Sequence, residues 1–272
     1  MAGMHLPGSS AVLFAAALAT VCARAADIVT VDLRSRVELF KGSGEWREVS
    51  LREPLPLAKT AIVICDMWDK HWCRGATERV GLLVPKMASF LKTARAQGIQ
   101  IVHAPSETMD FYRDAPQRRR MLAIAPVAPP ASLPLPDPPL PIDDSRGGCD
   151  TGGSFYKAWT REHPGLEIAP EDVVSDNGAE IYSFLRTRGI STLLVMGVHT
   201  NMCILNRSFA IKRMTSLGIR CILVRDLTDA MYNPADPPHV SHEQGTQLVI
   251  EHIEKFWCPT TTSADLLRAF GR

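Results

Sequence analysis

The chain has 272 residues, of which 46% are apolar and 22% are charged, and its formal net charge is +1. These proportions are typical of globular proteins and allow one large α/β domain with a sizeable core. A net charge so close to zero does not give the basic surface that binding to nucleic acid or to an anionic membrane requires.

The N-terminus has the pattern of an export signal. Residues 11–21 form an apolar run of signal-peptide length, and residues 23–25 (Ala-Arg-Ala) place small side chains where a signal peptidase reads them. We expect a signal peptide over residues 1–25 and an exported mature protein, periplasmic or extracellular, over residues 26–272. An uncleaved anchor and a lipid-modified Cys22 are the alternatives. No later stretch is long and apolar enough to span a bilayer.

The first half of the mature chain predicts strands and one helix. Residues 28–39 and 45–51 are strand-like and flank a Gly-Ser-Gly turn, which indicates a short N-terminal β-hairpin. The apolar run at residues 60–65 is typical of a strand buried on both faces. Residues 78–97 are amphipathic and precede a glycine, as a helix would. Another strand is predicted over residues 99–104.

The segment at residues 126–141 contains eight prolines. Proline lacks a backbone N–H and cannot occupy a helix interior or a central strand. We therefore expect an insertion that runs over the surface of one domain, and not a linker between two domains.

Strands and helices alternate in the rest of the chain. The predicted elements are a strand at 172–175, a helix at 179–188, a strand at 192–198, a helix at 202–217, a strand at 220–224 and a helix at 244–256. Such alternation favours right-handed crossovers. We predict a single α/β domain over residues 26–272, with a doubly wound, mainly parallel sheet and helices on both faces.

Chemically useful side chains follow the predicted strands. Asp66, His103 and Cys203 each stand at or just past a strand's carboxyl end, where ligands bind in sheets of this kind. The start of a helix favours a thiolate, because unpaired N–H groups and the helix dipole stabilise negative charge. Cys203 is therefore a candidate nucleophile, and Asp66 is a candidate base that takes the thiol proton. A buried structural cysteine is the alternative.

The sequence resembles the isochorismatase-like cysteine hydrolases, which include nicotinamidases and other small-amide hydrolases. The resemblance covers roughly residues 60–256 and rests on three segments, 61–66 (AIVICD), 188–203 (RGISTLLVMGVHTNMC) and 218–226 (GIRCILVRD). It implies a Rossmann-like three-layer fold and cleavage of a C–N amide bond in a small molecule through a thioester intermediate.

The resemblance also implies roles for individual residues. Cys203 looks like the nucleophile and Asp66 like the acid/base. A cis peptide would join Val198 and His199, so that the N–H groups of His199 and Cys203 form an oxyanion hole.

One position departs from the family pattern. The family has a lysine after the strand that precedes the 179–188 helix, but residues 173–178 contain none. A cation there would lower the pKa of the thiol. Arg161 is our preferred replacement, with Lys157 and Lys70 as alternatives. The missing lysine also motivates an alternative function, a non-catalytic small-molecule-binding protein on the same scaffold.

The residues predicted to bind the substrate come from loops near the same edge of the sheet. They are Trp68, His103, Trp159, Thr200, Asn201 and Tyr232, and further aromatic residues at Trp72, Tyr112 and Phe155 suit a planar or apolar ligand. We predict no metal, because no second histidine follows Asp69 and His71 at ligand spacing, and no cofactor. A homo-oligomer is possible, although no segment marks an interface.

Six cysteines remain after the predicted signal peptide. Cys73, Cys149 and Cys258 are the expected disulfide partners, because Cys65 and Cys221 lie in predicted buried strands. Cys203 must stay unpaired if it is a nucleophile. No Cys-x-x-Cys motif occurs, which disfavours a thiol redox protein.

Overall fold

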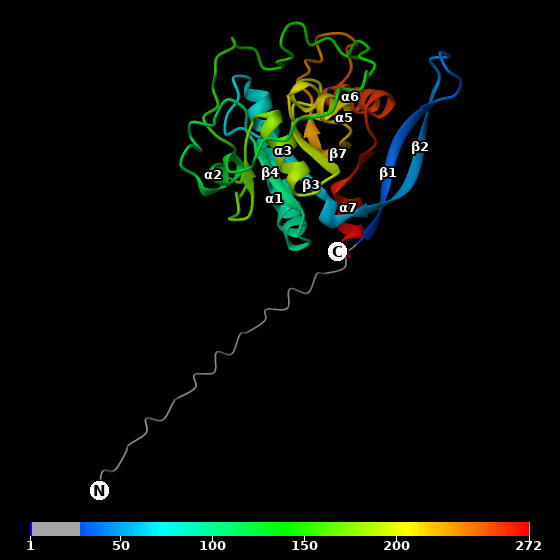
Figure 1. Ribbon diagram of the computed structural model, residues 1–272. Coiled ribbons are helices and arrows are strands. Elements are labelled where there is room, and N and C mark those ends of the chain that lie inside the picture. Colours follow the sequence, from blue (N-terminus) through cyan, green and yellow to red (C-terminus); the bar gives the residue numbers. More distant parts are fainter. Residues whose placement is uncertain (2–27, 272) are drawn as a thin grey trace.

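The described residues form one sheet of eight strands in the order β2-β1-β8-β7-β6-β3-β4-β5. Figure 1 shows the β1–β2 end of this sheet at one side of the molecule. The computed structural model describes Met1 and residues 28–271, so nearly all of the predicted signal peptide lies outside the described residues. The strands are β1 (Ile28–Glu38), β2 (Trp46–Pro56), β3 (Thr60–Cys65), β4 (Gln100–Ala104), β5 (Val173–Val174), β6 (Thr192–Val198), β7 (Arg220–Asp229) and β8 (Thr260–Thr261). All neighbours from β8 to β5 are parallel, and β1 is antiparallel to both β2 and β8. The mainly parallel α/β sheet and the N-terminal hairpin are confirmed.

Helices cover both faces of the sheet. They are α1 (Arg74–Ala96), α2 (Pro116–Leu122), α3 (Gly178–Thr187), α4 (Cys203–Asn206), α5 (Ile211–Ser216), α6 (His242–Phe256) and α7 (Ser263–Ala269), with a 3-10 turn η1 (Leu57–Lys59). Apolar residues of α1 and α7 share one core cluster, and those of α3 to α6 share the cluster on the other face. None of the helices in residues 28–271 combines the length and the apolarity that crossing a membrane needs.

The buried strands explain why the chain folds as a doubly wound sheet. Every residue of β3 and β6 is buried. Alternate residues of a strand point to opposite faces, and in β3 Ile62 and Ile64 join the α1 face while Ala61 and Val63 join the α3 to α6 face. Both faces therefore need an apolar side chain at every position, which produces the continuous apolar runs in the sequence.

The segment after β6 differs from the prediction. A single helix was expected over residues 202–217, but the chain forms two short helices, α4 and α5. Arg207 interrupts them with an extended backbone (φ −60°, ψ 151°). The short elements α2, β8 and α7 were not predicted either, while the proline-rich segment 126–141 contains no helix or strand, as expected.

The strand order reverses between β3 and β6. The chain leaves β3 toward β4 on one side and leaves β6 toward β7 on the other, and this type of switch point opens a crevice at the carboxyl ends of the strands. Cys65 and Gly197 pair at this end of the two strands. Gly197 has φ 113°, and a Cβ atom there would lie 2.0 Å from the carbonyl oxygen of Cys65. The close approach of the two strand ends therefore requires a glycine.

We predict that Gly197→Ala destabilises the protein by about 3 kcal/mol, because it adds both backbone strain and a clash with β3. Gly81→Ala is the matched control, since Gly81 is an exposed residue of α1 with no atom within 4 Å of an added Cβ. That change should be neutral or stabilising by up to about 1 kcal/mol. The free energy of unfolding in urea measures both. Equal stability of the two variants would contradict the argument.

Candidate active site

Cys203 and Asp66 meet at the switch point. Cys203 is the first residue of α4 and follows β6 closely, while Asp66 comes directly after β3. The Cys203 thiol donates a hydrogen bond to the Asp66 carboxylate. Asp66 is completely buried, and one of its oxygens accepts a hydrogen bond of 2.8 Å from the backbone N–H of Ser106. The structure therefore brings together the two residues that the sequence paired as nucleophile and base.

Arg207 is the cation of this site. Its Nε donates to Oδ2 of Asp66 at 2.9 Å, and Nη1 lies 3.7 Å from Oε1 of Glu107. Its guanidinium also lies over the ring of Trp68, 6.0 Å from the centroid. Sequence reasoning missed Arg207, because it was expected inside a helix over residues 202–217, whereas its backbone is extended and its partner Asp66 is distant in the sequence.

Arg161, the residue predicted for that role, lies elsewhere. Its guanidinium stacks over Phe111 at 5.4 Å, and its backbone carbonyl accepts from the N–H of Asp69. Two further hydrogen bonds run from Thr160 to the carboxylate of Asp69. The segment that carries Arg161 is thus tied to the loop after β3 by its backbone, so its side chain does not supply the charge beside Asp66.

The thiol of Cys203 is protonated at neutral pH. Burial raises its pKa far above the ordinary value, and the Asp66 carboxylate raises it further, while Arg207 acts in the opposite direction. The expectation of a thiolate at a helix start is wrong here for a physical reason. Helix α4 has only four residues, so its dipole is small compared with burial and a carboxylate at hydrogen-bonding distance.

The acidity of Asp66 is set by two opposing effects. Burial raises the pKa of its carboxyl group, and the positive charge of Arg207 lowers it, as do the hydrogen bonds from Cys203 and Ser106. The carboxylate and the thiol are therefore coupled, and a proton can pass between them without crossing solvent.

The backbone beside Cys203 has the predicted geometry. The peptide between Val198 and His199 is cis, as the family resemblance implied. The N–H of His199 points at the Cys203 sulfur. Neither this N–H nor that of Cys203 donates to a backbone carbonyl among the described residues. Both backbone donors therefore lie beside the sulfur, where they could meet an oxygen atom bound next to it.

Cys203 opens into a cavity of about 330 Å³ with largely aromatic walls. Trp68 and Trp159 stack face to face with centroids 4.2 Å apart, and Phe155 meets Trp159 and Trp72 edge-on at 6.2 and 6.0 Å. The remaining lining residues are His71, Glu107, Gly147, His199, Met202, Cys203, Arg207 and Met231. Trp68 and Trp159 stack on each other and so offer the cavity a flat aromatic surface, which suits a planar ligand.

The two histidines of the cavity are uncharged at neutral pH. Burial lowers the pKa of His71 to about 4, and burial together with the proximity of His71 lowers that of His199 to about 3. Nδ1 of His71 accepts a hydrogen bond from the N–H of Cys73, so its proton is on Nε2. The charges of the wall therefore come from Glu107 and Arg207 alone.

Four of the predicted substrate-binding residues do not line this cavity. His103 is fully buried between two carboxylates, with 2.6 Å from Nδ1 to Glu162 and 3.0 Å from Nε2 to Asp172. The three other side chains form hydrogen bonds within the protein. Thr200 bonds to the Thr228 hydroxyl, and Tyr232 donates to the carbonyl of Asp236. The Asn201 amide bonds to Asp144 and to the backbone of Met231. His103, Thr200 and Tyr232 support the loops of the site from behind. Asn201 lines a neighbouring cavity of about 450 Å³ that also reaches Cys203, and Trp68 and Trp159 line the aromatic cavity.

A disulfide holds one wall of the cavity. Cys73 and Cys149 are bonded, with their Cα atoms 5.6 Å apart, and Arg79 adds an ion pair of 2.6 Å to Asp150. Two of the three expected disulfide partners are thus confirmed, but Cys258 is free and buried. Cys203 is unpaired, as the hypothesis of a nucleophile requires.

The described residues contain one cluster with the spacing of a metal site. It consists of Cys73, Cys149 and Asp150, whose ligand atoms lie within 4.8 Å of one another. The two sulfur atoms are joined in the disulfide and so supply no thiolate ligands. This cluster therefore does not fit a metal ion.

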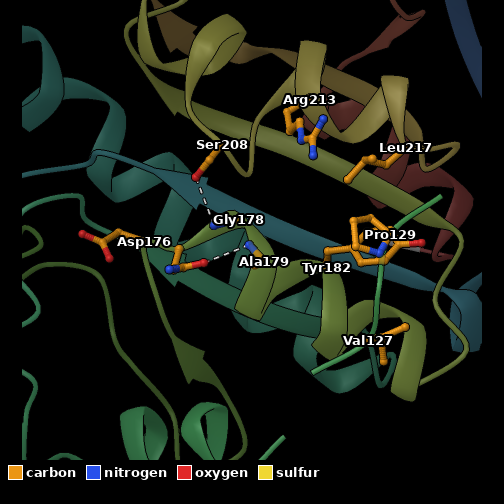
Figure 2. A pocket seen from close by; sticks show the side chains of 10 residues that line it. Val127, Pro129, Asp176, Gly178, Ala179, Tyr182, Ser208, Arg213 and Leu217 are labelled. Atoms are coloured by element: carbon orange, nitrogen blue, oxygen red, sulfur yellow. Dashed lines mark hydrogen bonds between the residues drawn. The ribbon is translucent and has the colours of Figure 1, made fainter. Parts of the chain in front are cut away.

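A second cavity, of about 460 Å³, lies away from Cys203 (Figure 2). Figure 2 shows Gly178, Ala179 and Tyr182 of α3 on one side and Arg213 and Leu217 on the other. Its polar groups are already paired, since the N–H of Gly178 donates to the hydroxyl of Ser208 and Arg213 donates to Ser132. This cavity has no thiol and no paired acid and base, so the candidate active site is the aromatic one.

Comparisons with known proteins agree with this fold. No protein-family model matches the chain, and no curated protein sequence matches it. Among solved structures, a cysteine hydrolase from Pseudomonas syringae pv. phaseolicola 1448A is similar with a TM-score of 0.55 and 18% identity, over 81% of this chain and 96% of that one. Two further structures are also similar. One is an isochorismatase family protein from Burkholderia thailandensis, with a TM-score of 0.46 and 17% identity over 79% of this chain and 97% of that one. The other is an isochorismatase from Pseudomonas putida KT2440, with a TM-score of 0.47 and 17% identity over 76% of this chain and 90% of that one. The isochorismatase-like fold that the sequence resemblance implied is confirmed.

The buried His103 predicts a pH-dependent stability. Burial alone lowers its pKa, but Glu162 and Asp172 outweigh burial and raise the pKa from 6.5 to about 9. Because the folded pKa is the higher one, protonated His103 stabilises the fold fully below pH 6.5, and this contribution is lost as the pH rises through 9. The shift corresponds to about 3 kcal/mol.

We therefore expect the free energy of unfolding of the wild type to fall from about pH 6.5 to 10 relative to that of His103→Gln, which cannot titrate. Urea titrations across this range measure the difference. His239→Gln, the same change at an exposed histidine, should leave the slope of the wild type intact. Parallel curves for the wild type and His103→Gln would refute the assignment.

Proposed function

We propose that the protein is a cysteine hydrolase that cleaves the C–N bond of a small amide through a thioester on Cys203. The observation that carries this proposal is the contact series from Cys203 to Asp66 to Arg207 at the end of an aromatic cavity. A nucleophile, a base that can take its proton and a cation that orients the base are the parts that acyl transfer needs.

In the proposed reaction, Asp66 takes the thiol proton as the Cys203 sulfur attacks the amide carbonyl carbon. The N–H groups of His199 and Cys203 stabilise the resulting oxyanion. The tetrahedral intermediate then collapses to a thioester, and Asp66 returns the proton to the leaving nitrogen, which departs as ammonia or an amine. Water, deprotonated by Asp66, hydrolyses the thioester to the carboxylic acid and restores the thiol.

The protonated resting thiol is compatible with this sequence. A thiol whose pKa is raised attacks only when its proton leaves at the same time, and Asp66 is already its hydrogen-bond acceptor. The separation of charge is local, because Arg207 neutralises the carboxylate before attack and remains beside it afterward. The thiolate is therefore formed at the moment of attack, which protects the sulfur from other reactions in the resting enzyme.

The alternative of a non-catalytic binding protein was motivated by the missing lysine. Arg207 now provides a cation in direct contact with Asp66, and no observation favours the alternative. Arginine keeps its charge at all accessible pH values, so it can hold the carboxylate but does not itself donate a proton.

We also propose that the enzyme acts in an oxidising compartment outside the cytoplasm. The Cys73–Cys149 disulfide supports this location, because such bonds persist in exported proteins and are rare in the cytosol.

Removal of the nucleophile or of the base should abolish hydrolysis. We expect Cys203→Ala and Asp66→Asn each to lower kcat/KM by about a thousandfold or more, measured as ammonia release from a panel of primary amides such as nicotinamide, benzamide and acetamide. Cys221→Ala is the control, because this buried cysteine lies in β7. Hydrolysis by Cys203→Ala at the wild-type rate would overturn the proposal.

The Arg207 contact predicts a shift in the pH profile. Without the positive charge, the pKa of Asp66 rises further, so Arg207→Ala should move the acid limb of kcat/KM toward higher pH. Arg207→Lys keeps the positive charge, so its acid limb should lie close to that of the wild type. Arg161→Ala serves as the control that leaves it unchanged, since Arg161 stacks on Phe111. If Arg161→Ala shifted the acid limb and Arg207→Ala did not, Arg161 and not Arg207 would be the cation that acts on Asp66.

A further inference from the structure

Strand β2 is a long free edge of the sheet. It pairs over eleven residues with β1 and has no other neighbour in the strand order. Figure 1 shows the β1–β2 hairpin at the border of the molecule, with β2 on the outer side. Among the described residues, no segment forms a backbone hydrogen bond with that outer side. An exposed edge of this length is a template for pairing with another strand.

The prolines of β2 indicate which backbone groups face outward. Pro54 and Pro56 lie opposite Thr30 and Ile28 of β1. Proline has no N–H, and in an edge strand it occupies positions whose N–H would point away from the neighbour. Backbone N–H and C=O groups point to alternate sides of a strand from one residue to the next. Glu48, Ser50 and Arg52 therefore present these groups to the outer side, as Pro54 and Pro56 do with their C=O groups.

The sequence of β2 is self-complementary about Ser50. Residues 47–53 read Arg-Glu-Val-Ser-Leu-Arg-Glu. Antiparallel pairing with a second copy, centred on Ser50, sets Arg47 opposite Glu53, Glu48 opposite Arg52 and Val49 opposite Leu51. Side chains directly opposite each other share a face of the sheet, so every charge meets its opposite. Shifting the centre by two residues, to residue 48 or 52, leaves these charges opposite uncharged or like-charged side chains.

The side chains are exposed enough to form these pairs. Arg47, Glu48 and Arg52 lie on the surface, and Leu51 is 38% exposed. Glu48 and Arg52 also contact Arg36 and Asp32 of β1, but at side-chain exposures of 49% and 77% they keep free surface for a second partner. Cross-strand pairing would then extend networks that already exist on the hairpin.

We propose that two copies of this chain associate through their β2 strands, antiparallel and centred on Ser50, and join their sheets into one. The contact is symmetric, so it uses up both outer edges and closes as a dimer. Pro54 and Pro56 supply no N–H, so the ladder of backbone hydrogen bonds ends before them on each side. The interface is remote from Cys203 and independent of the proposed hydrolysis.

A pair of charge reversals tests the register. In sedimentation velocity over a range of concentrations, the full-length wild type should form dimers. In the dimer, residue 47 of each copy faces residue 53 of the other, so this contact occurs twice. Arg47→Glu places two acidic side chains opposite each other in both contacts, and Glu53→Arg places two arginines there. We expect either change to raise the dimer dissociation constant by about tenfold or more. An equimolar mixture of the two variants should recover the wild-type constant, because both contacts in the mixed dimer are complementary again.

The control is Arg74→Glu, which reverses a charge of 78% side-chain exposure on α1 and should leave the dimer intact. Circular dichroism verifies that each variant is folded, which matters for Glu53→Arg because Glu53 also pairs with Arg220. Three results would overturn the proposal: a wild type that is monomeric at every concentration, a dimer that neither reversal weakens, and a mixture that does not recover the dimer.

Discussion

The ion pair between Asp66 and Arg207 is the interaction on which the candidate site depends. A buried carboxylate without a partner would be neutralised by a proton, and it could then no longer accept one from a thiol. Arg207 satisfies one oxygen of Asp66 and the N–H of Ser106 satisfies the other. The helix after Cys203 ends after four residues, and the extended Arg207 that follows it reaches the carboxylate. The break after α4 thus places Arg207 where it pairs with the buried charge.

The same arrangement affects the protonation of Cys203, the nucleophile in our proposal. In a free helix start the dipole would ionise the thiol, but here burial and a neighbouring carboxylate keep it protonated. The switch point makes this coupling possible, because it brings the ends of β3 and β6 into contact through Gly197. The titration of the thiol and the carboxyl group is therefore a property of the pair and not of either residue alone.

A buried polar network and a disulfide hold the loops that form the walls of the cavity. Protonated His103 links the sheet to Glu162, and the Cys73–Cys149 disulfide links the start of α1 to the loop that carries Phe155. Such supporting contacts fix aromatic side chains in place at a small entropic cost during binding. His103, Thr200 and Tyr232 were predicted to contact a ligand but are such supports, since a polar side chain after a strand serves either purpose.

The sequence by itself determined the α/β class, the parallel strands with their apolar runs, the hairpin and the pairing of Cys203 with Asp66, because strand-end positions and hydrophobic periodicity are local properties. The roles of Arg207, His103 and Tyr232 were decided only by the tertiary structure. Whether a side chain lines a cavity or is buried behind it depends on how loops from distant segments pack, and no local pattern encodes that choice. The cation was missed for the same reason: Arg207 contacts a carboxylate 141 residues away, and this partner exists only after β3 and β6 have become neighbours.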